Sequence, residues 1–356
     1  MFPFYSTIER IAAWFAILFN FSLIHLIQKK TIVSKVGKYK YLMMYTSIYE
    51  ILFAILHGIT VPVLFTTHCM NFLVMRVDKL LFPIPKPILQ VLNVLFCDMF
   101  GMSMSLFATH FIYRYMVLSR QKILRNSDSK VIILMIIFSL LFGLVWGVLA
   151  WDTMQPFAEA DAMITELVAI PTGLSLDQIA YVGVLFYTKD ANGNQVTHWP
   201  SVVGIGIQSV FIGISFILIC FFGYLCYQQT NNSMSMTQSA AATSLQNQLF
   251  YALVIQTLIP ICLMHIPASI VYAVAAMDRS NEIFGQFLSF TICLYPALDP
   301  LPNFFIIKSY RKAVKSFFKR LLRRLLCQPP APMSPNGTQS YPWVLSNNVS
   351  SVVPTF

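Results

Sequence analysis

A few ionisable residues interrupt long apolar stretches of this sequence, and their types and spacing are what could do chemistry. The clearest is Asp299, which lies among Pro296, Pro300 and Pro302 in the run LYPALDPLPNFFII. An ionisable group in hydrocarbon is costly, so it usually faces the interior of a helix bundle and serves a function. A helix broken by proline at membrane depth is also tolerated only inside a bundle. We therefore expect this stretch to pack inside a bundle, with Pro296 and Pro300 as hinges.

A second carboxylate, Glu50, lies in the run YLMMYTSIYEILFAIL. Glu50 lies about ten residues from Lys40 and Asp299 about nine from Lys308, so at about 1.5 Å per helical residue the two acids have similar depth. As an intramembrane pair they would share a proton or hold a cation. The alternative is that each acid separately hydrogen-bonds a backbone carbonyl or a neighbouring polar side chain.

Three further residues are candidate ligand contacts. Asp98 lies in the outer half of the third apolar stretch, Met102 follows it by four residues, and His265 lies in the sixth stretch. Asp98 could instead tie two helices together, and His265 could be an interior histidine with an ordinary hydrogen-bond partner. Pro260 and Pro267 flank His265, and two prolines predict a bent, movable helix.

Arg114 and Tyr115, at the inner end of the third stretch, are candidate switch residues. The alternative for Arg114 is an anchor whose long side chain reaches the membrane surface. A metal hydrolase would need His and acid ligands clustered at one depth, whereas His57, His110 and His265 are single residues on three stretches. We therefore expect no enzyme, no metal site and no cofactor.

The elements that must position these residues follow from composition. Of 356 residues, 57% are hydrophobic and only 11% charged, whereas soluble domains carry roughly 25% charged residues. Windows of about 20 apolar residues predict membrane spans. There are seven of them: residues 8–27, 41–65, 88–118, 131–150, 201–227, 249–277 and 286–307. The predicted fold is an all-α membrane protein, a seven-transmembrane helix bundle occupying residues 1–308.

The positions of the basic residues predict the orientation. The loops after the first and third windows and the tail after the seventh hold 18 of the 24 lysines and arginines, counting Arg114 at the end of the third. Because basic loops stay in the cytoplasm, we expect the N-terminus outside and the C-terminus inside. The net charge of +10 is thus a topological signal and gives no reason to expect nucleic acid as a partner.

Three segments lie outside the windows. Apolar residues recur at helical spacing through residues 309–327 with cations between them, which predicts an amphipathic helix on membrane lipid. Cys327 at its end is a possible palmitoylation site. Residues 328–356 are expected to be a disordered cytoplasmic tail, and the uncharged segment 228–248 a flexible linker.

Four stretches of the sequence resemble a known family. They are YKYLMMYTSIYEILFAILHGITVP, HFIYRYMVLS, LQNQLFYALVIQTLIPICLMHIP and YPALDPLPNFFIIKSYRKAV. Together they are similar to the nematode seven-transmembrane chemoreceptors of the Str superfamily (serpentine receptor class r), a group that includes a diacetyl odorant receptor. The resemblance implies a G-protein-coupled receptor in the plasma membrane of a sensory cilium. Its expected partners are a small odorant or soluble chemical and a heterotrimeric G protein.

The resemblance also bears on Arg114 and Tyr115, which look like the counterpart of the acid-Arg-Tyr switch of other receptors. Tyr113 replaces the acid of that motif. The main alternative function is a seven-span ligand-gated chemosensory ion channel of the insect type. Such a channel has its N-terminus inside, and the lysines after the first window argue against that orientation.

Overall fold

The structure is a computed structural model that describes residues 5–30, 37–119, 121–190, 192–232 and 240–326. Cys327 and the tail 328–356 lie outside the described residues. By length and composition, six described helices could cross a membrane, or up to seven if Glu282–Ile306 and Lys308–Leu325 together count as one span.

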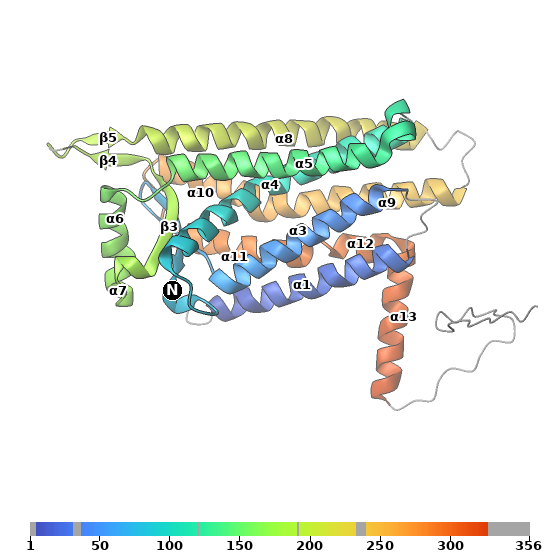
Figure 1. The fold of residues 1–356 in the computed structure, drawn as a ribbon, viewed down its shortest axis with the longest axis horizontal. Coiled ribbons are helices and arrows are strands. Elements are labelled where there is room, and N and C mark those ends of the chain that lie inside the picture. Colours follow the sequence, from blue (N-terminus) through green and yellow to red (C-terminus); the bar gives the residue numbers. More distant parts are fainter. Residues whose placement is uncertain (1–4, 31–36, 120, 191, 233–239, 327–356) are drawn as a thin grey trace, which may run out of the picture. The chain divides into compact units, whose positions relative to one another are not determined.

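Most of the described chain is helical (Figure 1). Five spans are single helices: α1 (Tyr5–Lys30), α3 (Tyr39–Thr60), α4 (Lys86–Leu118), α5 (Lys122–Thr153) and α8 (Trp199–Asn232). The sixth comprises α9 (Ala240–Pro260), the π-helical segment η5 (Ile261–His265) and α10 (Ile266–Ala276). The seventh comprises α11 (Glu282–Leu298) and α12 (Leu301–Ile306), and α13 (Lys308–Leu325) follows.

The helices extend beyond most of the apolar windows because they continue into polar flanks. The expected linker 228–248 is wrong at both ends, since residues up to Asn232 belong to α8 and residues from Ala240 belong to α9. Helix α13 (Lys308–Leu325) covers most of the range 309–327, and its placement on membrane lipid stays a prediction. Its apolar residues Phe317, Phe318, Leu322 and Leu325 are exposed.

Prolines explain the breaks in the last two spans. A proline removes the N–H that would bond the carbonyl four residues earlier. Directly after Pro260 the sixth span changes to the π-helical segment η5. In the seventh span Pro300 leaves the carbonyl of Pro296 without its helical donor, and Asn20 Nδ2 of α1 donates to that oxygen at 3.0 Å.

One end of the bundle carries a β-sheet that the all-α prediction did not contain. Strands β1 (Val63–Thr67), β2 (Met70–Arg76) and β3 (Ile179–Leu185) are antiparallel in the order β1-β2-β3. In register, Thr67 faces Met70 across the hairpin turn and Val74 faces Tyr181. We call this end of the bundle the sheet end, and the opposite end the Arg114 end.

The sheet corrects the predicted second span. Residues 41–65 were expected to be one helix, but α3 ends at Thr60 and β1 begins at Val63. Val61 closes α3 with a left-handed φ of 45°, and its N–H bonds the carbonyl of His57 at 2.8 Å. Pro62 cannot continue a helix, and the β-branched residues around it favour a strand.

Polar side chains fasten the sheet to two helices. Asn93 Nδ2 of α4 donates to the carbonyls of Leu73 at 3.0 Å and Ala180 at 3.3 Å. Ser289 Oγ of α11 accepts from the backbone N–H of Leu64 at 2.8 Å. Every residue of β3 is buried, so the sheet is part of the core at this end.

The loop between α5 and α8 is structured. It contains α6 (Ala158–Ile164), the π-helical η2 (Thr165–Ala169), α7 (Ile170–Thr172), the short 3-10 helix η3 (Leu176–Gln178) and the hairpin of β4 (Tyr187–Lys189) and β5 (Gln195–Thr197). Tyr181 of β3 donates to Asp161 of α6 at 2.7 Å. Burial and the Asp161 carboxylate raise the pKa of Tyr181, so its hydroxyl remains a donor at neutral pH.

Candidate functional site

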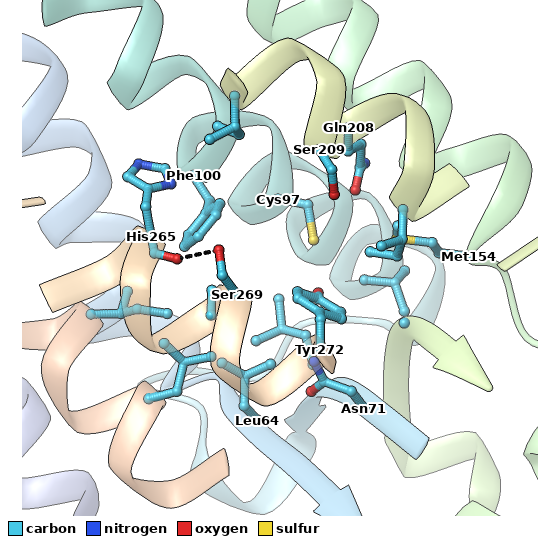
Figure 2. Close-up of a pocket in the computed structure, with 18 of the residues that line it drawn as sticks. Leu64, Asn71, Cys97, Phe100, Met154, Gln208, Ser209, His265, Ser269 and Tyr272 are labelled. Atoms are coloured by element: carbon cyan, nitrogen blue, oxygen red, sulfur yellow. Dashed lines mark hydrogen bonds between the residues drawn. The ribbon is translucent and has the colours of Figure 1, made fainter. Parts of the chain in front are cut away.

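A cavity of about 400 Å³ lies between the sheet and helices α4, α5, α8, α10 and α11 (Figure 2). Apolar side chains form most of its wall, including Leu64 of β1, Phe100 of α4 and Leu288 of α11. Labelled in the figure are Leu64, Asn71, Cys97, Phe100, Met154, Gln208, Ser209, His265, Ser269 and Tyr272. Cavities of this size, mostly apolar with a few polar groups, are the usual form of small-molecule sites.

His265 is the one predicted ligand contact that lines this cavity. It is the last residue of the π-helical segment after Pro260. Its Nε2 lies 3.0 Å from Ser103 Oγ, and its ring packs against Phe100 with 5.0 Å between centroids. Its backbone carbonyl accepts from Ser269 Oγ at 2.8 Å. The break at Pro260 therefore places His265 against α4 in the cavity wall.

Asp98 and Met102 do not join His265. They line a separate apolar groove of about 720 Å³, formed by α3, α4 and the segment around Pro83. The Asp98 side chain packs against Gly143 and Gly147 of α5, two positions where a Cβ would meet it. Successive helical residues are about 100° apart, so Asp98 and Cys97 face different spaces although they are neighbours in sequence.

Glu50 and Asp299 meet in the middle of the bundle. Both side chains are buried, at 1% and 0% exposure, and they lie close enough to interact electrostatically with each other. Gln256 Nε2 of α9 donates to Asp299 Oδ2 at 2.7 Å. We call Asn20, Glu50, Gln256 and Asp299 the central polar cluster, since together they join the first, second, sixth and seventh spans.

A second buried pair joins α1 to α3 nearer the sheet end. His57 Nε2 lies 3.4 Å from Glu9 Oε1, and both side chains are almost inaccessible. Phe96 packs on the His57 ring with 5.5 Å between centroids. His57 is thus an interior histidine with an acidic neighbour, and it does not line the cavity.

Arg114 lies at the opposite end of α4 and is 2% exposed. Its Nη1 donates to Gln246 Oε1 at 2.7 Å and its Nη2 to the Gln246 carbonyl at 2.8 Å. The guanidinium also lies over the Tyr39 ring, 5.4 Å from its centroid. Both hydrogen bonds go to α9, so Arg114 clamps the third span to the sixth.

Neighbouring aromatic residues hold Arg114 in this position. Tyr113 stacks on Tyr39 with 5.7 Å between ring centroids and donates to Asp128 of α5 at 2.7 Å. The Tyr39 hydroxyl lies 2.9 Å from His110 Nδ1. Tyr115 packs on Phe222 of α8 with 5.6 Å between centroids. Tyr113, which replaces the expected acid, therefore bonds to Asp128 of α5, and Arg114 bonds to Gln246.

Sequence reasoning missed Asn71, Gln208 and Gln246. Asn71 lies in a strand that was read as the end of a span and a loop, and Gln246 lies in the segment expected to be a linker. Residues 63–76 show no alternation of apolar and polar residues, so only Pro62 before them could have indicated that the helix ends there. The fully apolar surroundings of Gln208 give no signal beyond its polarity.

These features define a seven-helix receptor of rhodopsin-like fold: a cavity under a capped end, a central polar cluster and a buried arginine at the far end. Squid rhodopsin superimposes with a TM-score of 0.61 at 13% sequence identity, covering 92% of this chain and 87% of that one. The likeness shows the fold alone.

The family follows from sequence. Residues 5–315 match the serpentine type 7TM GPCR chemoreceptor Str family, and the chain belongs to it. The "G-protein coupled receptor str-217" of Caenorhabditis elegans is 33% identical over 320 residues, covering 89% of this chain and 90% of that protein. The "Serpentine receptor class r-10" of the same organism is 26% identical over 294 residues, covering 81% and 84%.

The protein is therefore a multi-pass membrane receptor of a chemoreceptor family. The family match favours the receptor over the chemosensory ion channel that the sequence left as an alternative.

Proposed function

We propose that this receptor binds a small odorant or soluble chemical in the cavity beneath the sheet and activates a heterotrimeric G protein at the Arg114 end. The basic loops favour the Arg114 end as the cytoplasmic one. A ligand arriving from outside would then meet the sheet end first, where the cavity lies.

The observation that carries this proposal is that one span touches all three regions. The sixth span contributes Gln246 to the Arg114 clamp, Gln256 to the central polar cluster and His265 to the cavity wall. Gln246 and His265 are 19 residues apart, which is roughly 28 Å along a helix. Movement of this span would therefore change the contacts of Gln246 with Arg114 and of His265 with the cavity.

In this proposal the arrangement described above is the closed state of the receptor. Arg114 holds α9 against α4, and a G protein would need these helices to separate. Pro260 and the π-helical segment after it are the kind of break at which helices bend. A ligand that contacts His265 acts on that same segment. Ligand and G protein would then bias one two-state change, and each would strengthen binding of the other.

The clamp gives a direct test. In Gln246→Ala one hydrogen bond to Arg114 is lost and the backbone one is kept, which should weaken the closed state by about 1–2 kcal/mol. We expect basal G-protein activation to rise by a factor of about 5–30. Asn247→Ala, at the next position, should leave it unchanged. Equal basal activity in both variants would contradict the clamp.

Arg114 itself tests coupling. Arg114→Ala and Arg114→Lys should both reach the surface and keep agonist binding without G protein. Both should lose most agonist-stimulated signalling, because we propose that Arg114, once released from Gln246, contacts the G protein, and neither alanine nor lysine offers its planar fork of donors. Full signalling by the lysine variant would instead make Arg114 an anchor at the membrane surface.

We propose the sensory cilium of a chemosensory neuron as the place of action. The support is the family, which is one of chemoreceptors and whose members named above come from a nematode. A fluorescently tagged chain expressed in such a neuron should concentrate in the cilium. A signal confined to the cell body would contradict this.

A further inference from the structure

We infer that the cavity selects an uncharged, mostly hydrocarbon ligand with one oxygen function, a carbonyl or hydroxyl, that is hydrogen-bonded by the amide of Asn71 or of Gln208. This inference rests on the proposed function in one respect, that the cavity is the ligand site. It adds the chemical class of the ligand and the two residues whose side chains can recognise its oxygen.

The first observation is the absence of charge in the wall. Among the described residues that line the cavity there is no Asp, Glu, Lys or Arg. Asp98, the acid nearest in sequence, lines the other groove. Moving a charged ligand from water into such a site would cost far more than a neutral one, since nothing would pair with the charge. An ammonium or a carboxylate ligand is therefore disfavoured.

The second observation is a pair of open amides. Asn71 of β2 is 1% exposed, and Gln208 of α8 is 5% exposed. Both residues line the cavity, and within the described part of the chain Asn71 Nδ2 and Oδ1 and Gln208 Nε2 make no hydrogen bond. A buried polar group left unpaired costs about 1–3 kcal/mol, so two of them around one cavity indicate that something polar completes them when the site is filled.

His265 and Ser269, two other polar residues of the cavity wall, already have hydrogen-bond partners. His265 already has Ser103 as a partner, and Ser269 donates to the His265 carbonyl. The open amides come from the sheet and from α8, and Figure 2 shows Asn71 and Gln208 on different sides of the cavity. Asn71 is held in the sheet with Thr66 and Val184 as its strand neighbours, which fixes its side chain in the wall.

The cavity has the size of a small-molecule site. Its volume of about 400 Å³ falls in the range of roughly 300–1,000 Å³ that is usual for such sites. Phe96, Phe100 and Leu288 offer apolar surface for the ligand's hydrocarbon part, which the hydrophobic effect would drive out of water.

The test uses purified full-length receptor without G protein and follows its thermal unfolding with five seven-carbon probes: 2-heptanone, 1-heptanol, heptane, heptylamine and heptanoate at neutral pH. A probe that binds only the folded state raises the midpoint. We expect the ketone and the alcohol to raise it at the lowest concentrations and the ammonium and carboxylate to have no effect. Equal stabilisation by the charged probes would overturn the inference, as would no stabilisation by either neutral oxygen compound.

Variants then test the two amides. At least one of Asn71→Leu and Gln208→Leu should weaken 2-heptanone binding by about tenfold while leaving heptane binding unchanged, because it removes the hydrogen bond to the oxygen. Gln208→Glu should admit heptylammonium, because a carboxylate then faces the cavity. Ser215→Ala, on α8 but outside the cavity wall, is the control and should change nothing. Because Asn71 lies in the sheet, unchanged heptane binding by Asn71→Leu is needed to show that this variant still has an intact cavity.

Ketone binding that is unaffected in both leucine variants would mean that water alone satisfies the amides, and would overturn their role. Failure of the proposed function has a different signature. If 2-heptanone binds through these amides and no bound probe changes G-protein activation, the ligand class stands and the coupling proposal fails.

Discussion

Glu50 and Asp299 are brought together from two helices with neither carboxyl exposed and with Gln256 donating to one of them. Two neighbouring carboxyl groups in an apolar interior titrate as a pair, since a proton or cation bound to one changes the affinity of the other for a proton. The similar depth of the two residues is the basis on which the sequence predicts a pair. Its role in signalling is a proposal.

A double-mutant cycle tests that role. Glu50→Gln and Asp299→Asn should each reduce agonist response, and the double variant should lose less than the sum, with a coupling of about 0.5–3 kcal/mol. The readout is agonist concentration–response with surface expression measured in parallel. Ser139→Ala, a buried position on α5, serves as a control. Additive losses would mean two unrelated polar anchors.

Depth along a helix was predictable at the residue scale, and direction around it was not. Counting residues placed Glu50 level with Asp299. The same counting could not show that Asp98 and Met102 face a different space from His265, because this depends on how α4 is rotated in the bundle. Gln246 escaped notice because a neutral partner for Arg114 leaves no charge pattern to read.

At the element scale, two glycines, Gly183 and Gly285, allow close backbone contacts of the sheet. A Cβ on Gly285 of α11 would collide with the carbonyl oxygen of Leu64 in β1, and a Cβ on Gly183 of β3 would collide with that of Asn71. Such close approach is available only to glycine. The cavity lies directly beneath these strands, so the two contacts help to set its shape.

Gly285→Ala should therefore force α11 and β1 apart. Overpacking of this kind costs about 1–3 kcal/mol, and we expect a lower unfolding midpoint for the purified receptor. Gly206→Ala is the matched control, because a Cβ there meets nothing within 4 Å and alanine favours a helix. A midpoint for Gly285→Ala equal to that of Gly206→Ala would contradict the close packing of α11 on the sheet.

Helix α13 is the element with the strongest separation of apolar and charged residues. Its exposed phenylalanines and leucines alternate with lysines and arginines at helical spacing. Each cation near anionic lipid contributes about 1 kcal/mol. This supports the proposal that α13 lies on the inner leaflet.

Charge reversal tests that proposal. A peptide covering residues 308–327 should bind vesicles of anionic lipid and bind neutral vesicles weakly. Replacing Arg320, Arg323 and Arg324 by Glu should abolish binding to the anionic vesicles. Equal binding before and after the change would contradict a surface helix held by charge.

For the whole molecule, the number and order of the spans were predictable because an apolar window of about 20 residues matches the thickness of a bilayer and is rare in soluble chains. The sheet was not, since its strands are as apolar as a span and follow α3 with only Pro62 to separate them. Burial on both faces removes the alternation that normally marks a strand. The role of Asn71 in the cavity wall could not be predicted for the same reason, because Asn71 belongs to the sheet.

The orientation in the membrane remains a prediction from the basic loops. A tag placed before Tyr5 and one inserted after Asn192, in the turn between β4 and β5, belong to the sheet end and should both be stained on intact cells. A tag after Phe356 should be stained only after permeabilisation. The hairpin insertion is the more reliable outside marker, because β4 and β5 belong to the folded loop between α5 and α8 and must lie on the same side of the membrane as that loop. Staining of the C-terminal tag alone on intact cells would reverse the orientation, place Arg114 outside and favour the ion channel.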